Sequence, residues 1–143
     1  MFILLRLPGR DTGLSHSIQA LILALAEAWA LEFRRGNRPP SLYQSGIIYQ
    51  PEPSEWKAEE WADPMLVASR GWGDCDDLVI YRLAEILADS NYDPKQGQRS
   101  GLPAWPMVYR KMDGSQRYHI GIRHADGSEE DPARRLSKDG KVS

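Results

Sequence analysis

The sequence has little of what marks membrane, secreted or nucleic-acid-binding proteins. Its 143 residues include one cysteine, so no disulfide can form within the chain. Its 18 lysines and arginines nearly balance 20 acidic residues, which gives no electrostatic reason to expect binding to nucleic acid or to an anionic membrane. The apolar opening FILL is far too short for a secretory leader or a membrane span. We therefore expect a protein of a reducing, cytoplasmic compartment, without nucleic-acid or membrane partners.

The length is that of one ordinary domain, large enough to bury a core without disulfides or metals. We therefore predict a single domain over residues 1–143. Its core is expected at about 45–135, after an N-terminal strand and long helix within 1–36. A basic tail at 133–143 is expected to be loosely ordered at its end. The predicted order, helices first and then antiparallel strands, indicates an α+β fold.

The N-terminal part combines an apolar run with a long stretch rich in alanine and leucine. The run at 1–7 predicts a strand, and residues 14–35 predict a long, well-buried helix. Ser15 or Ser17 is expected to cap the start of this helix, and Gly36 its end.

The rest of the chain predicts short strands and turns. Residues 47–50 are a short strand candidate, and residues 51–64, with three prolines and two tryptophans, are expected to wrap the surface irregularly. Residues 107–132 are typical of two hairpins, with turns at 113–114 and 126–127, each an aspartate followed by a glycine.

The only cysteine, Cys75, lies in the first turn of a predicted amphipathic helix, in the stretch GWGDCDDLVIYRLAEIL. Asp74 is expected as the N-cap and Asp77 as its capping partner three residues on. The apolar face at helical spacing consists of Val79, Leu83, Ile86 and Leu87. The side chains expected to point away from that face are Arg82, Glu85 and Asp89.

The position of Cys75 exposes its thiol to opposing influences. Unpaired backbone N–H groups and the positive end of the helix dipole favour the thiolate. The neighbouring carboxylates of Asp74, Asp76 and Asp77 disfavour it. Capping accounts for two of these acids and leaves three roles open for Asp76: to accept a hydrogen bond from a downstream arginine, to bind a substrate amine, or to favour the helix dipole.

A reactive thiol needs a base, and the base needs a partner that orients it. His119 and His124 are the downstream candidates, while His16 is expected to cap or flank the long helix. His124 lies beside the second predicted turn and is expected as an exposed loop residue. Asp131 begins the segment that returns from this turn, so we expect its carboxylate beside His119 on the adjacent strand. The chain order of the candidate triad is then Cys75, His119, Asp131.

The stretches GWGDCDDLVIYRLAEIL and YHIGIRHADGSEEDP together resemble the transglutaminase-like branch of the papain-fold cysteine peptidases. GDCDDL is the strongest part of the match and is common in small bacterial and phage-encoded members. The resemblance implies a papain-like or transglutaminase-like α+β core, in which the cysteine helix packs on a small antiparallel sheet. It also implies Cys75 as nucleophile, His119 as base and Asp131 as the residue that orients the base.

Two features depart from the family's pattern. Ile120 and Gly121 stand where a small residue and an aromatic residue usually follow the family histidine. No side chain stands out as a dedicated oxyanion donor, and the candidates for oxyanion or substrate binding are Trp72, Gln50 and Asp76. A backbone N–H at the glycine-rich bend before the helix is a further candidate.

The resemblance implies thiol-dependent acyl transfer on an amide or peptide bond. We expect hydrolysis, because water is always available and no amine pocket is legible; with an amine as acceptor the protein would be a transglutaminase. The expected substrate is a protein or peptide, with a peptidoglycan peptide, a viral or phage protein and a host protein left open.

The competing hypothesis is a non-catalytic binding or phage-particle module that retains the fold. Its contact surface would be a groove formed by Trp56, Trp61, Trp72 and Trp105. No cofactor is expected. A metal site of Cys75, His119 and His124 is disfavoured because it lacks a fourth ligand and paired spacing, and the adjacent acids at 74, 76 and 77 lack the alternating spacing of a calcium loop.

Overall fold

The computed structural model describes residues 2–5, 12–51, 59–96, 101–110 and 118–138. It has an α+β architecture. The elements, in chain order, are β1 (Phe2–Leu5), α1 (Thr12–Arg34), the 3-10 helix η1 (Leu42–Gln44), β2 (Ile48–Tyr49), β3 (Glu59–Ala62), α2 (Pro64–Arg70), β4 (Trp72–Gly73), α3 (Cys75–Ala88), β5 (Ala104–Arg110), β6 (Tyr118–His124), β7 (Glu129–Glu130) and α4 (Pro132–Leu136).

The described strands form one three-stranded sheet and two pairs. The sheet has the order β5-β6-β7 and is antiparallel throughout, with His119 opposite Tyr109 and Ile122 opposite Glu130. The strands β1 and β3 pair antiparallel, whereas β2 and β4 form a short parallel pair directly before α3. The parallel pair therefore fixes the chain at the entry to the cysteine helix.

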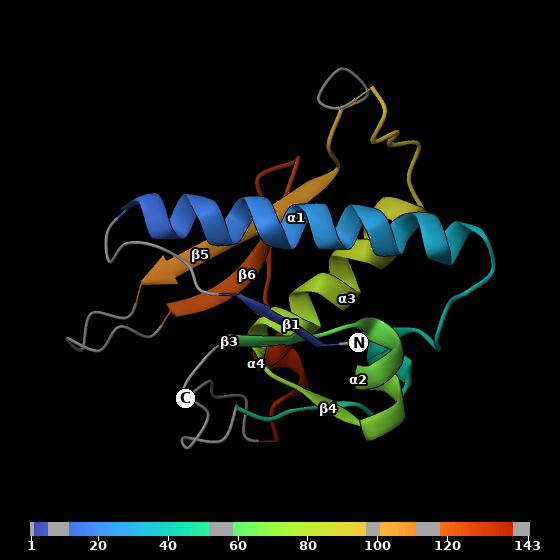
Figure 1. Ribbon diagram of the computed structural model, residues 1–143, viewed down its shortest axis with the longest axis vertical. Helices are drawn as coiled ribbons and strands as arrows, with labels where there is room; N and C mark the ends of the chain where they lie inside the picture. Colours follow the sequence, from blue (N-terminus) through green and yellow to red (C-terminus); the bar gives the residue numbers. More distant parts are fainter. Residues whose placement is uncertain (1, 6–11, 52–58, 97–100, 111–117, 139–143) are drawn as a thin grey trace.

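The core lies between the two long helices and one face of the three-stranded sheet. Figure 1 shows α1 running across the molecule, with β5 and β6 beside it and α3 crossing beneath it. Apolar positions recur every three or four residues in α1 and α3, so each helix buries one stripe. The fully buried apolar residues of this core include Ile22, Ala26, Val79, Leu83, Ala104, Ile120 and Ile122.

The N-terminal expectations are confirmed except for the cap. A strand lies within 1–7, and the long helix spans Thr12–Arg34. Because this helix begins at Thr12, Ser15 and Ser17 lie inside it, and the prediction that either caps its start is wrong. Gly36 has a φ of 97°, the left-handed conformation expected just after a helix end.

The end of α1 is also tied to the end of α3. The Arg34 guanidinium donates to four backbone carbonyls there, those of Leu87, Ala88, Ser90 and Tyr92. Leu87 and Ala88 are the last two residues of α3, where carbonyls lack an intrahelical N–H, and the Leu87 carbonyl also accepts from Ser90. Ser90 and Tyr92 belong to the segment that follows the helix. The two core helices are thereby held together at that end.

The interpretation of residues 51–64 as an irregular surface segment is wrong for its second half. Residues 59–62 form β3, and Trp61 is only 2% exposed. The indole packs in the main core while its Nε1–H reaches a buried carboxylate, which is how a tryptophan is accommodated in an interior. Residues 52–58 lie outside the described part of the chain.

The C-terminal part contains the second predicted turn and a helix that was not predicted. The second predicted turn is confirmed, with Gly127 at φ 90° between β6 and β7, while the turn at 113–114 lies outside the described residues. The basic tail begins with a helix: residues 132–136 form α4, and Ala133 is fully buried. The end of the tail, which was expected to be loosely ordered, lies outside the described residues from 139 on. Asp131 caps this helix by accepting from the Arg134 N–H at 3.1 Å.

No helix in the described part of the chain is long and apolar enough to cross a membrane.

Candidate active site

The start of α3 has the predicted capping box. Asp74 accepts from the Asp77 N–H at 3.1 Å, and Asp77 accepts in return from the Asp74 N–H. Asp77 is 1% exposed, and its carboxylate also accepts hydrogen bonds from the Ala62 N–H at 2.7 Å and from the Arg70 guanidinium at 2.9 Å. The expected capping roles of Asp74 and Asp77 are confirmed, and the arginine that pairs with Asp77 is Arg70, at the end of α2.

The bend before α3 needs its glycines. Gly71 ends α2 with a φ of 84°, a conformation that favours glycine. A Cβ at Gly73 would lie 3.1 Å from the Asp77 Cβ and 3.2 Å from Leu78 Cδ2, so a larger residue would push the start of α3 away. The two glycines bring the chain from α2 into the first turn of α3 and so place Cys75.

His119 and Asp131 are brought together as predicted. His119 lies on β6, and Asp131 directly follows β7, the neighbouring strand. Their Nε2 and Oδ2 atoms are 2.8 Å apart. Burial alone would raise the pKa of Asp131, but the hydrogen bonds from His119 and from the Arg134 N–H outweigh it, so the pKa lies below its usual value. The carboxylate is thus suited to hold the imidazole in one orientation.

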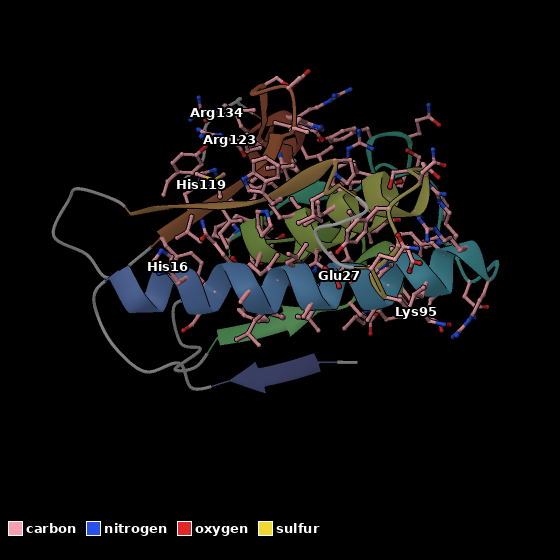
Figure 2. All side chains as sticks on the ribbon, turned by 90° about the horizontal axis from the view of Figure 1, so that it is seen from above. His16, Glu27, Lys95, His119, Arg123 and Arg134 are labelled. Atoms are coloured by element: carbon pink, nitrogen blue, oxygen red, sulfur yellow. The ribbon has the colours of Figure 1, made fainter. Side chains whose placement is uncertain are left out.

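The other ring nitrogen of His119, Nδ1, is buried and has no hydrogen-bond partner among the described residues. The ring is stacked on Tyr109, with centroids 6.4 Å apart and an angle of 25° between the planes. Figure 2 shows His119 with Arg123 and Arg134 on the side of β5 and β6 that faces away from α1. A cavity of about 360 Å³ opens on this face, and its lining includes Tyr109, His119, Gly121 and Asp131.

Cys75 lies half-buried at the first position of α3, against the backbone of β6. Burial raises the pKa of its thiol well above the ordinary value, the charges of Asp76 and Asp74 raise it further, and a hydrogen bond from the Ile120 backbone opposes this shift only in part. The helix start therefore does not make this thiol a preformed thiolate. The sulfur contacts the backbone of Ile120, the residue that follows His119. No hydrogen bond links the Cys75 and His119 side chains, both of which the structure describes.

Asp76 has a different environment from any that the sequence suggested. It is 1% exposed, and its Oδ2 accepts from Trp61 Nε1 and from the Tyr118 hydroxyl, each at 2.9 Å. Its Oδ1 lies 3.5 Å from Cys75 Sγ. A carboxylate buried in this way cannot serve as an open site for a substrate amine, so that interpretation of Asp76 is wrong.

The two remaining oxyanion candidates lie at the parallel pair before α3. Trp72 stacks against the Arg70 guanidinium, 3.6 Å from its ring centroid, so it packs the bend. The Gln50 residue is exposed, and its backbone N–H donates to the Gly73 carbonyl at 2.9 Å. Both residues therefore have structural contacts that hold the glycine bend.

A polar cluster under β7 was missed by the sequence analysis. The Glu130 carboxylate accepts from the Tyr43 hydroxyl, from Arg82 Nε at 2.6 Å, and pairs with His124 Nε2 at 3.0 Å. His124 is thus a half-buried strand residue, and the expectation of an exposed loop residue is wrong. Because Glu130 precedes Asp131, the cluster anchors β7 where the candidate triad needs it.

Glu85 also departs from its predicted orientation. It is 2% exposed, accepts from the Leu42 N–H at 3.2 Å and lies 3.5 Å from Arg82 Nη1. The helical pattern placed it away from the apolar face, but η1 packs over that side of α3 and buries it. The positions of the charged residues in the helix did not predict the contact between η1 and α3.

The described tryptophans do not share one contact surface. Trp61 is in the core, Trp72 is stacked on an arginine, and Trp105 lines a separate cavity of about 550 Å³ against α1, next to His16 and Leu23. Trp56 lies outside the described residues. The predicted tryptophan groove is therefore wrong as far as Trp61 is concerned.

Among the described residues, no group of three histidine, cysteine, aspartate or glutamate side chains is arranged to hold a metal ion. Comparison with known proteins gives no matching family model, no similar curated protein and no similar solved structure. The function of this chain must therefore be inferred from its own geometry.

Proposed function

We propose that the protein catalyses thiol-dependent acyl transfer on an amide or peptide bond, with water as acceptor, in a papain-like or transglutaminase-like arrangement of Cys75, His119 and Asp131. The observation that supports the proposal is the environment of the two ring nitrogens of His119. Its Nε2 is held by Asp131 at 2.8 Å, while its Nδ1 is buried and has no hydrogen-bond partner in the part of the chain that the structure describes. His119 also directly precedes Ile120, whose backbone contacts the thiol.

The protonation states fit activation by a general base. A half-buried thiol beside carboxylates is a poor nucleophile on its own, so it needs a base that removes its proton as it attacks. The proton of Cys75 would pass to His119 Nδ1, and the sulfur would bond to the acyl carbon. His119 would then give the proton to the leaving amine, and water would hydrolyse the thioester.

The start of α3 also supplies donors for a developing oxyanion. The first N–H groups of a helix have no intrahelical partner, and they point out of its N-terminal end. The Cys75 N–H belongs to this set, so it is the candidate donor that the geometry favours over the side chains of Gln50 and Trp72.

The leading alternative is a non-catalytic module that retains the same arrangement. The raised pKa of Cys75 and the absence of a hydrogen bond from its sulfur to His119, both among the described residues, favour this alternative. Transfer to an amine in place of water is the second alternative, and it shares every chemical step up to the thioester.

The test measures fluorophore release from a panel of fluorogenic peptide amides, and incorporation of a fluorescent primary amine into casein. The wild type is compared with Cys75→Ala, and His119→Gln is compared with His124→Gln. The two histidines lie on the same strand, and each contacts a carboxylate, so the second substitution controls for loss of a histidine ion pair.

Release that is lost in Cys75→Ala and reduced about 100-fold or more in His119→Gln, with His124→Gln close to wild type, is the expected result. Amine incorporation with the same dependence would replace hydrolysis by transglutamination. Equal signals from wild type and Cys75→Ala in both assays would overturn the proposal in favour of the non-catalytic module.

A further inference from the structure

The Asp76 carboxylate joins three elements at the nucleophile. It belongs to α3, its Oδ2 accepts from Trp61 on β3 and from Tyr118 on β6, and its Oδ1 faces Cys75 Sγ at 3.5 Å. Trp61 and Asp76 are 2% and 1% exposed, so water does not compete for these contacts. The carboxylate is therefore fixed in place from the core side.

The contact with sulfur has a chemical direction. A carboxylate only accepts, and a thiol can donate only while it carries its proton. The 3.5 Å contact between Sγ and Oδ1 is therefore an S–H···O interaction, which a thiolate could not make. The alternative acceptor, His119 Nδ1, has no hydrogen-bond partner within the described ranges.

The other charged and polar groups around the thiol do not reverse this preference. From α3 itself, Asp74 adds a second negative charge, while Asp77 is paired with Arg70 from α2. From β6, the Ile120 N–H favours the thiolate, and the Tyr118 hydroxyl is directed at Asp76. Among the described side chains, the carboxylates of Asp76 and Asp74 are the charges that act on the sulfur, and both disfavour the thiolate.

We propose that Asp76 is a positioning residue that holds the Cys75 thiol protonated and directed away from His119 in the resting protein. The inference rests on the proposed function, in which the same proton later passes to His119 Nδ1: the S–H bond breaks, the N–H bond forms, and the sulfur electron pair bonds to the acyl carbon. The resting thiol would then resist alkylation and oxidation until a substrate displaces it from Asp76.

The test is the rate of Cys75 alkylation by iodoacetamide across about pH 6 to 10, read by mass spectrometry. Asp76→Asn keeps the shape and removes the charge. Tyr118→Phe keeps the charge and removes one hydrogen bond to it, so the carboxylate becomes a stronger acceptor. Asp89→Asn is the control, because Asp89 is an exposed carboxylate at the other end of α3, paired with Arg38.

The two substitutions near the thiol are expected to act in opposite directions. Asp76→Asn should raise the alkylation rate about tenfold or more near neutral pH and move the midpoint of the profile to lower pH. Tyr118→Phe should lower the rate or leave it unchanged, and Asp89→Asn should match the wild type. A role in packing alone would accelerate alkylation in both Asp76→Asn and Tyr118→Phe, because both would loosen the site.

Acceleration in both variants, or an unchanged rate in Asp76→Asn, would overturn the inference. If Asp76→Asn does not fold, Tyr118→Phe decides, since acceleration there contradicts the inference and slowing supports it. Failure of the proposed function would look different: the alkylation rates would follow this pattern while Cys75→Ala and the wild type gave equal signals in the acyl-transfer assays.

Discussion

The two faces of β6 differ in what they do for the molecule. On one face, Ile120 and Ile122 are fully buried against the long helices. On the other, His119, Gly121 and Arg123 border a cavity or an exposed ion pair. Because side chains alternate along a strand, one seven-residue segment carries both the core contacts and the candidate base.

This difference explains how a small domain keeps a polar site rigid. The core face fixes the strand by apolar burial, so His119 needs only Asp131 and Tyr109 to set its orientation. Glu130 adds a second anchor through Arg82 and the neighbouring polar cluster. Stability and chemistry can therefore be changed separately, by substitutions on opposite faces of β6.

The largest expected effect is on the free energy of unfolding, from a substitution on the buried face of β6. Ile122→Ala should lower the free energy of unfolding by about 3 kcal/mol, because it leaves a cavity among residues that cannot close it. Urea denaturation followed by circular dichroism measures the change. A loss below about 1 kcal/mol would mean that this face is less tightly packed than described.

The next effect separates chemistry from stability. Asp131→Asn should reduce acyl transfer about 100-fold, because asparagine does not stabilise the charged imidazole as a carboxylate does. The free energy of unfolding should change little, since asparagine also caps a helix and α4 keeps its N-cap. Parallel rate and denaturation measurements check both halves, and a stability loss as large as that of Ile122→Ala would contradict the separation.

A smaller effect is expected at the entry to α3. Asp74→Ala removes one side of the capping box and should cost about 1 kcal/mol of unfolding free energy. It also removes a negative charge near Cys75, so alkylation of the thiol should become faster. A thermal melt and an iodoacetamide rate measure the two effects; a slower alkylation would show that the helix start matters more than the charge.

The smallest effect is a pH dependence of stability. Asp131 has a lowered pKa in the folded protein, so its contribution is present above the unfolded pKa of about 3.9 and is lost as the pH falls through the folded value. Asp131→Asn lacks this contribution. Its unfolding free energy should fall less steeply than that of the wild type below about pH 4. Identical slopes in acid denaturation would show that the carboxylate is not stabilised by its partners.

Local patterns predicted the capping box, the helix around Cys75, the long N-terminal helix and the pairing of His119 with Asp131. Each depends on neighbours in sequence or on a hairpin, where strand alternation fixes which side chains meet. The partners of Asp76 were not predictable in this way, because Trp61 lies on β3, and the prolines around this strand led to the prediction of an irregular segment.

The other errors have the same origin. The orientations of Glu85 and His124 were predicted from their positions in a helix and beside a turn. Contacts from elsewhere in the chain bury Glu85 and half-bury His124. At Cys75, the helix start and the neighbouring carboxylates left the state of the thiol open. Burial, which the sequence does not show, raises its pKa, together with the charges of Asp76 and Asp74. Long-range packing, which one sequence does not show, set these outcomes.

The most direct test of the central claim uses an acyl donor that needs no specific recognition. Mixing the protein with p-nitrophenyl acetate and following it by intact-protein and peptide mass spectrometry shows whether an acetyl group reaches Cys75 and leaves again. The account predicts an acetyl group on Cys75 that the wild type releases to water and that His119→Gln forms and releases far more slowly. Acetylation of Cys75 at the same rate in both proteins, or none at all, would contradict the claim that His119 activates this thiol.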